Sequence, residues 1–142
     1  MDPLCFNRFL VIRVDEQISL EGVPDKELRR YFEEAHHCYL YGLDVACAVL
    51  CRAILDSALE RTCDPWHLIE RNVPRQEYFK RLLEEAERGG LLTDDRPESA
   101  WKVRHAGNDA IHEFPRFEIL WQHKLGEILE DTRKVLLDLY GS

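Results

Sequence analysis

The stretch VACAVLC at residues 45–51 is apolar on every side of a helix, and no other feature constrains the fold as strongly. A helix without a polar face has to be covered by other elements, so we expect it to be the most buried helix of the molecule. It should begin near Asp44, a good N-cap residue, and run to Cys63, because Asp64-Pro65 stops it.

The segments on both sides of this helix have the periodicity that would let them cover it. Pro74 and Pro97 suit helix starts, and Gly89-Gly90 suits a helix end. The expected helices are 25–42, 44–63, 74–88, 97–113 and 116–140. The buried faces outside the central helix should contain Leu28, Phe32, Ala35, Tyr39, Tyr78, Phe79, Leu82, Leu83, Ala86, Phe117, Leu120, Ile128, Val135 and Leu139. This pattern predicts an all-α fold, a bundle of four to five helices.

The chain of 142 residues is long enough for one domain with a real core, and we divide it into a short arm and a bundle. Residues 1–22 form the arm, where FLVIRV has the composition of a strand and GVP then marks a turn. A single strand has no visible partner in a helical chain. We therefore expect an extended arm that packs on the body, residues 23–142, or on another subunit.

The net charge of -8 and the pI of about 5.2 argue against a broad basic surface that follows a nucleic-acid backbone. They leave room for a small site where a few cations meet one phosphate, and for a basic protein partner. No apolar run is long enough for a signal peptide or a membrane span, so we expect a cytoplasmic protein without membrane contact.

The cysteines and histidines do not form a metal site in the sequence. The five cysteines are an odd number and contain no C-x-x-C pair, which indicates a reducing compartment with cysteines as small core residues. Cys47 and Cys51 could hold two positions of a zinc site, but nothing nearby supplies the rest. His36 and His37 point about 100° apart on a helix and cannot share one ion well. We expect no metal and no cofactor.

The helix before Pro115 carries an unusual polar stripe in the stretch VRHAGNDAIHEFP, residues 103–115. Its members lie within a sector of roughly 100° on a helix and are Trp101, Arg104, His105, Asn108 and His112. The opposite side should pack in the monomer and contains Val103, Ala106, Gly107, Ala110, Ile111 and Phe114. The stripe is either a partly solvated helix face, with Trp101 lying over the body, or a functional site.

As a functional site, the stripe has the side chains of a metal-independent ribonuclease. A histidine can take a proton from a ribose 2′-OH or protonate the leaving oxygen. An arginine can hold the phosphate and offset the charge of the transition state, and an asparagine can orient either group. One histidine cannot easily be both acid and base, so a second copy across a dimer axis, or His105, would help His112.

Arg104, Gly107-Asn108, Ala110 and His112 resemble the signature of the HEPN superfamily of helical domains. More closely, they resemble an uncharacterised branch of it that occurs in restriction-endonuclease polypeptides and as stand-alone bacterial proteins. The resemblance extends upstream to VP at 23–24, Glu34-Ala35, Gly42 and Arg52 in RAILDSAL, and so covers roughly residues 23–140.

The resemblance implies a HEPN-like bundle that dimerises, with arginine and histidine from both copies lining a cleft that cuts RNA. Arg104 and His112 become the catalytic candidates and Asn108 the polar helper. Seven residues separate Arg104 from His112, whereas the nuclease motif usually has four to six. The two residues are about 80° apart and about 12 Å apart along the axis, so joint contact with one phosphate depends on long side chains or on the partner subunit.

Arg52 lies in the very apolar helix and needs a carboxylate, for which Glu34 or Asp109 could serve. If Arg52 faces the Asn108 stripe, it joins the site. Three functions follow from these observations: a HEPN-like endoribonuclease of toxin-antitoxin or phage-defence type, a non-catalytic HEPN-like module, and a small-ligand or nucleotide-binding bundle. The module would form a homodimer or bind a partner such as an antitoxin or a nuclease subunit.

Overall fold

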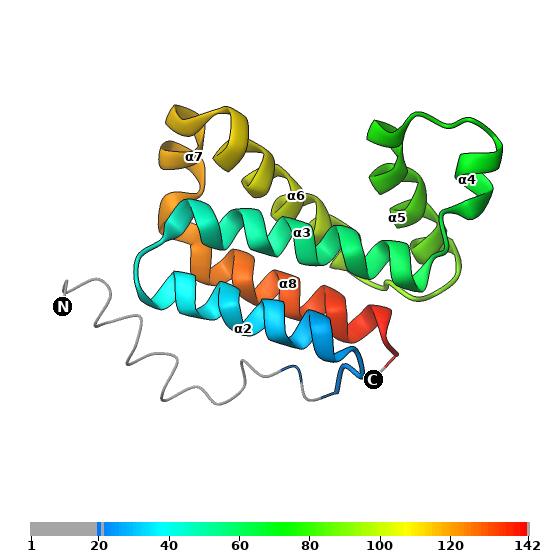
Figure 1. Cartoon of the computed structure of the whole chain (residues 1–142), viewed down its shortest axis with the longest axis horizontal. Helices are drawn as coiled ribbons and strands as arrows, with labels where there is room; N and C mark the ends of the chain where they lie inside the picture. The colour runs from blue at the N-terminus through cyan, green and yellow to red at the C-terminus, as the bar shows by residue number, and fades with distance from the viewer. Residues whose placement is uncertain (1–19, 21, 142) are drawn as a thin grey trace.

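The computed structural model describes Leu20 and residues 22–141. This part of the chain contains seven α-helices, two short 3-10 helices and no strand, so the predicted all-α fold is confirmed (Figure 1). The predicted arm, residues 1–22, lies almost entirely outside the described residues. The elements are α2 (Lys26–Leu40), α3 (Asp44–Thr62), α4 (Trp66–Glu70), η1 (Arg75–Glu77), α5 (Tyr78–Arg88), α6 (Arg96–His112), α7 (Phe114–Leu120), η2 (Gln122–Lys124) and α8 (Leu125–Leu139).

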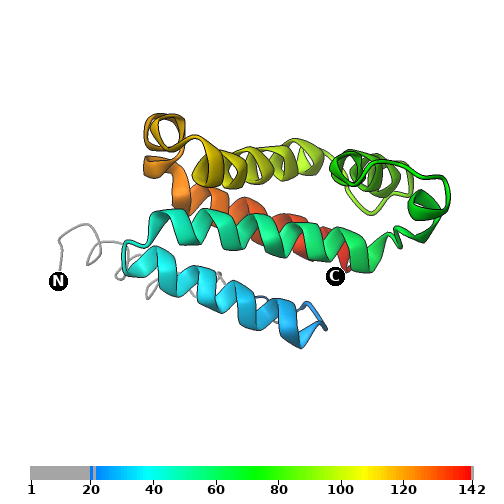
Figure 2. The same ribbon diagram turned by 45° about the horizontal axis from the view of Figure 1, so that its top comes forward.

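Helix α3 lies at the centre of the bundle, as its all-round apolar sequence predicts. It packs extensively against α6, α2 and α8, and α6 in turn packs on α8. Figure 2 shows α3 between α2 and α6, with α8 behind it. The short helices α4 and α5 lie at one end of this arrangement and α7 lies at the other (Figure 1).

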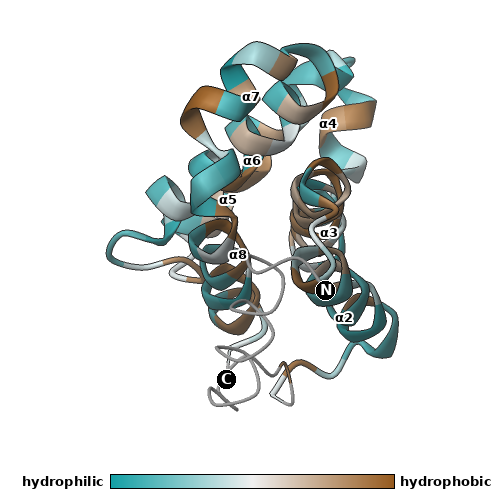
Figure 3. Cartoon of the chain, turned by 90° about the vertical axis from the view of Figure 1, so that its left-hand side faces the viewer, coloured by the Kyte–Doolittle hydropathy of each residue, from teal (hydrophilic) through white to brown (hydrophobic). Residues whose placement is uncertain are grey.

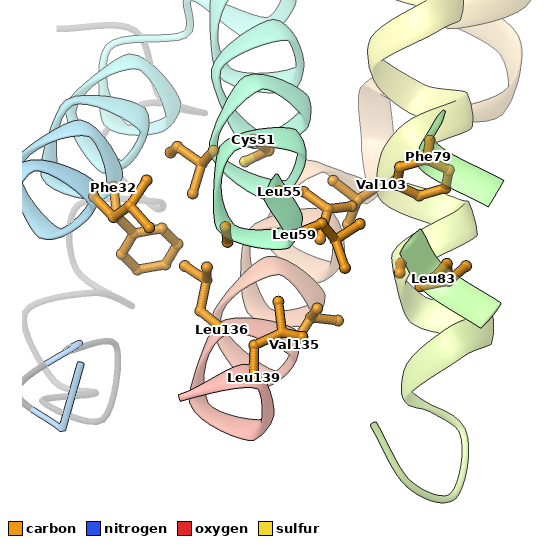
Figure 4. Packing of buried hydrophobic residues seen from close by; sticks show 14 of the residues in the cluster. Phe32, Cys51, Leu55, Leu59, Phe79, Leu83, Val103, Val135, Leu136 and Leu139 are labelled. Carbon is orange, nitrogen blue, oxygen red and sulfur yellow. The ribbon is translucent and has the colours of Figure 1, made fainter. Parts of the chain in front are cut away.

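The main core collects side chains from six helices, α2, α3, α4, α5, α6 and α8. Figure 4 shows Phe32 of α2, Leu55 of α3, Leu83 of α5, Val103 of α6 and Leu136 of α8 around one interior. Each of these side chains is almost completely buried, and burying one of this size contributes about 1.5–3 kcal/mol. A surface ion pair contributes about 1 kcal/mol at most, so apolar packing dominates the stability of the bundle.

The first helix has a well-defined start and end. Asp25 caps α2 by accepting hydrogen bonds from the amides of Glu27 at 3.1 Å and Leu28 at 3.2 Å. Arg61 at the end of α3 donates to Asp25 at 2.5 Å and thereby ties the two helices together. Gly42 has a φ of 74°, a conformation that glycine adopts at little cost, and it turns the chain from α2 into α3.

The prediction of a single helix over 116–140 is wrong, because the chain there forms α7, η2 and α8 instead. Pro115 lies in the first turn of α7. The break after α7 is fixed by Trp121, whose indole N–H donates to the Asp109 carboxylate of α6 at 2.8 Å. Phe117 of α7 is buried in a second, smaller cluster with Ala48, Ala110 and Leu125, whereas Leu120, expected to be buried, is exposed.

The described helices include none whose length and apolar character would let it cross a bilayer.

Candidate functional site

Arg104 of the predicted stripe is held by a carboxylate that the sequence analysis did not single out. Its Nη1 donates to both oxygens of Asp56 on α3, at 2.6 Å and 2.8 Å. The guanidinium also lies over the ring of Phe79, 4.8 Å from its centroid. Arg104 is therefore fixed between α3 and α5, with 18% of its side chain exposed.

Arg52 shares this carboxylate. Its Nε lies 3.8 Å from Oδ2 of Asp56, one helical turn further along α3. The expectation that Glu34 or Asp109 would pair with Arg52 is wrong: Glu34 is exposed, and Asp109 is occupied by Trp121 and by Arg116 at 3.5 Å. The i, i+4 spacing of Arg52 and Asp56 in RAILD is the signal in the sequence that could have found the correct partner.

Gly107 explains why the two arginines come so close together. A Cβ at this position would lie 2.4 Å from the Cβ and 2.8 Å from the Cδ of Arg52. Only glycine therefore lets α6 approach α3 at this level, and the stem of Arg52 lies directly over it. The small residues predicted to pack here, Ala106 and Ala110 among them, are indeed fully buried.

The two arginines line an open pocket between α3, η1, α5 and α6, with a volume of about 480 Å³. We call it the arginine pocket and define it by Arg52, Asp56, Arg75, Phe79 and Arg104. Its lining also includes Glu60, which pairs with Arg75 at 3.8 Å. Three arginines thus face two carboxylates in a chain whose net charge is -8.

The pKa values of the charged side chains in the pocket are shifted by burial and by the neighbouring charges. Burial raises the pKa of the Asp56 carboxyl from its ordinary value, although the nearby arginines, with Arg104 foremost, act to lower it. Burial and the positive charge of Arg104 lower the pKa of Arg52, and Asp56 only partly opposes them. The pocket therefore holds two cations that one carboxylate does not fully balance.

Trp101 and His105 continue the stripe beside the pocket. Trp101 is partly buried and packs edge-on against Phe79, with ring centroids 4.9 Å apart. His105 is exposed and stacks on Trp101 at 5.5 Å. Trp101 thus lies over the body of the protein, and it presents His105 to solvent next to Arg104.

Asn108 and His112 lie further along α6 and outside the arginine pocket. Asn108 is half-buried, and His112 is the exposed last residue of the helix. Because eight residues of helix span about 12 Å, His112 and the tethered Arg104 do not meet at one point within a single subunit. The structure brings Arg52, Arg104 and Trp101 together, but it does not bring His112 to them.

A second surface, which the sequence analysis missed, lies at the opposite end of α6. Ile111 and Phe114 were expected to pack in the monomer, but both are exposed, because α6 ends at His112 and the chain turns away into α7. Phe114 joins Leu43 and Val45 in lining a groove of about 590 Å³. Figure 3 looks onto this end of the molecule, where brown hydrophobic segments are visible on α7. We call this surface the apolar end, which comprises Leu43, Val45, Ile111, Phe114, Ile119 and Leu120.

The histidine, cysteine and acidic side chains of the described residues form no group that could hold a metal ion. Cys47 and Cys51 are fully buried in the core, as expected, and both are free thiols. A hydrogen bond with Cys51 and burial raise the pKa of the Cys47 thiol, so it remains protonated and unreactive.

A protein-family model described as Domain of unknown function (DUF4145) matches residues 33–140. The chain belongs to this family. No curated protein and no solved structure matches it. The DUF4145 match includes the arginine pocket, the whole of α6 and the apolar end, so all three features lie within the family domain.

Proposed function

We propose that this DUF4145 chain is a HEPN-like association module of toxin or defence type, which forms a homodimer through its apolar end. The HEPN-like assignment and the defence context rest on the resemblance of Arg104, Gly107-Asn108 and His112 to the HEPN signature. The association rests on one observation, the cluster of large apolar side chains that the bundle leaves uncovered around α7.

The exposure of these side chains is large enough to need an explanation. Phe114 is 57% exposed and Ile119 is 79% exposed, although the same short helix buries Phe117. Single exposed apolar residues are ordinary, but a contiguous group of them is typical of an interaction surface. Sequestering such a group from water stabilises an association by about 25 cal/mol for each Å² buried.

A second copy can use this surface because it offers both a groove and exposed apolar side chains. Leu43, Val45 and Phe114 line the groove, and Ile119 and Leu120 of α7 are exposed. A two-fold axis at this end of the molecule would let exposed side chains of each α7 enter the groove of the other copy, which gives a closed dimer.

The test is the molar mass in solution, measured by sedimentation equilibrium over a range of micromolar concentrations. Wild type should be a dimer, and Ile119→Asp should raise the dissociation constant by about a hundredfold or more, because a charge would be buried without a partner. The control is Ile69→Asp on α4, an exposed apolar residue at the other end of the molecule. A monomeric wild type, or equal effects of the two variants, would contradict the proposal.

The second candidate function is a metal-independent endoribonuclease, and the position of His112 favours it. His112 lies between Ile111 and Phe114, both members of the apolar end. A dimer formed there would bring the two copies of His112 towards the axis, and a pair of histidines could serve as acid and base for RNA cleavage. In this scheme Asn108, one turn before His112, would contact the phosphate that is cleaved. Arg104, with His105 beside it, lies about 12 Å from His112 along the helix and would hold a phosphate further along the RNA.

Cleavage of a mixed RNA pool in EDTA separates the two candidates. The ribonuclease predicts cuts by wild type that leave 2′,3′-cyclic phosphate ends, and their loss in His112→Ala and Arg104→Ala. His123→Ala, at an exposed histidine of η2, is the matched control that should keep full activity. No cleavage by a dimeric wild type would leave the association module as the function.

A further inference from the structure

We propose that the arginine pocket binds a small organic phosphate monoester, and that Arg52 and Arg104 hold its phosphate group. The pocket is lined by α3, η1, α5 and α6, whereas the apolar end lies at the far end of α6. This inference is therefore independent of the dimer. It shares Arg104 with the ribonuclease candidate but not Arg52, so changes at Arg52 test it separately from RNA cleavage.

The first support is the number of hydrogen-bond donors that the described residues leave unused. A guanidinium has five N–H groups. Among the described residues, Arg104 makes hydrogen bonds through Nη1 alone, both to Asp56, and Arg52 makes no hydrogen bond, only the ion pair at 3.8 Å. The Arg52 side chain is 22% exposed, and none of the unpaired nitrogens of Arg52 and Arg104 is sealed from the solvent, so a ligand in the open pocket can reach them. An oxyanion in the pocket would satisfy them.

The second support is the charge balance. The guanidiniums of Arg52, Arg75 and Arg104 meet the carboxylates of Asp56 and Glu60, which leaves one positive charge in the pocket. Two of these cations lie against the same carboxylate and repel each other. A further anion therefore lowers the electrostatic energy of the pocket, while the acidic remainder of the chain disfavours a long polyanion.

The third support is the shape of the acceptor that the donors require. Asp56 marks where an oxyanion lies between the two arginines, and Arg104 Nη1 already occupies both of its oxygens. A phosphate monoester has three terminal oxygens, so it can accept from two guanidiniums on different helices at once. A second carboxylate has only two oxygens and one negative charge, so it offers fewer acceptors and less charge to the two guanidiniums.

The size and the walls of the pocket define the rest of the ligand. The volume of about 480 Å³ is far more than a phosphate ion needs and falls within the range of small-molecule sites. Tyr78, which is partly exposed, provides the aromatic wall that a ligand can reach, because Phe79 is buried beneath the Arg104 guanidinium. The organic part of the ligand should therefore be small and at least partly flat, so that it can stack on this wall.

The experiment is isothermal titration calorimetry with phenyl phosphate at constant ionic strength. Phenyl phosphate should bind at least about tenfold more tightly than benzoate or dimethyl phosphate. Arg52→Gln should weaken binding by about tenfold or more, because it removes the donors and the charge. Asp56→Asn should strengthen binding by several-fold, because it removes the resident carboxylate that competes for Arg104. A purely structural role for these residues would not give a gain of affinity.

The control is Arg88→Gln on α5, whose side chain is 79% exposed and lies outside the pocket. It should leave the affinity unchanged. If Arg52→Gln does not fold, Arg52→Lys keeps the charge and the stem, and should lose about threefold in affinity with an unchanged circular dichroism spectrum. The proposal is overturned if wild type does not bind phenyl phosphate, if Arg88→Gln weakens binding as much as Arg52→Gln, or if dimethyl phosphate binds equally well.

Discussion

The middle and the last turn of α6 differ in how their unusual side chains interact. Near its middle, Arg104 is tethered to Asp56, lies over Phe79 and faces Arg52 across the Gly107 contact. At its last turn, Ile111 and the following Phe114 contact solvent. The first region has its strongest interactions inside the subunit, and the second has apolar surface that none of the described residues covers. Stability should therefore depend on the first region, and association on the second.

The largest effect on stability should come from Gly107→Ala. The added methyl group would lie 2.4 Å from the Cβ of Arg52, so α3 and α6 would have to move apart. We expect a loss of about 3 kcal/mol in the free energy of unfolding, measured by urea denaturation.

Gly126→Ala is the matched control for this change. There the added methyl group would meet the Tyr39 hydroxyl at 2.9 Å, the end of a side chain that can move. The gain in helix propensity of about 1 kcal/mol should offset much of the strain. Equal losses for the two variants would mean that the close contact between Gly107 and Arg52 matters no more for the free energy of unfolding than the contact between Gly126 and Tyr39.

A smaller effect should follow from Asp56→Asn. The change leaves two largely buried guanidiniums without their shared carboxylate. A fully buried ion pair costs about 3–5 kcal/mol to break, and partial exposure should reduce this to about 2 kcal/mol. Glu84→Gln, which disrupts a surface pair with Arg88 at 4.0 Å, should cost under about 0.5 kcal/mol in the same denaturation experiment. A neutral Asp56→Asn would show that the pocket does not contribute to stability.

The smallest effect should come from the apolar end. Ile119→Ser removes a side chain that is almost fully exposed in the subunit, so it should change the unfolding free energy of a dilute, monomeric sample by under about 0.5 kcal/mol. The same variant should weaken self-association. A loss of more than about 1 kcal/mol in the monomer would place Ile119 in the core and remove the contrast between the two regions.

The sequence predicts the arrangement of the helices better than it predicts their contacts. The central position of α3 follows from a helix without a polar face, and the buried positions of Phe32, Leu82 and Val135 follow from their spacing. The N-cap at Asp25 is likewise determined by residues close to it in the sequence. Each of these features is specified by residues within a few turns of one another.

The site was harder to predict because it depends on how helices cross. Arg104 was expected to face a phosphate, yet it meets Asp56, which is 48 positions earlier in the chain. The helical periodicity of the sequence also assigned Phe114 to the apolar face of α6, although a new helix begins at this residue. The end of α7 is held against α6 by the Trp121–Asp109 hydrogen bond, a tertiary contact that periodicity cannot reveal.

The contact at Gly107 also sets the register between the two longest helices. If α6 slid along α3 by one turn, about 5.4 Å, either Val103 or Ile111 would replace Gly107 against the stem of Arg52, and neither would fit. Because residue 107 has no side chain, α6 can pack along α3 in only one register. A displacement of the Arg52 side chain from Gly107 would therefore remove this constraint on the register of α6 and α3.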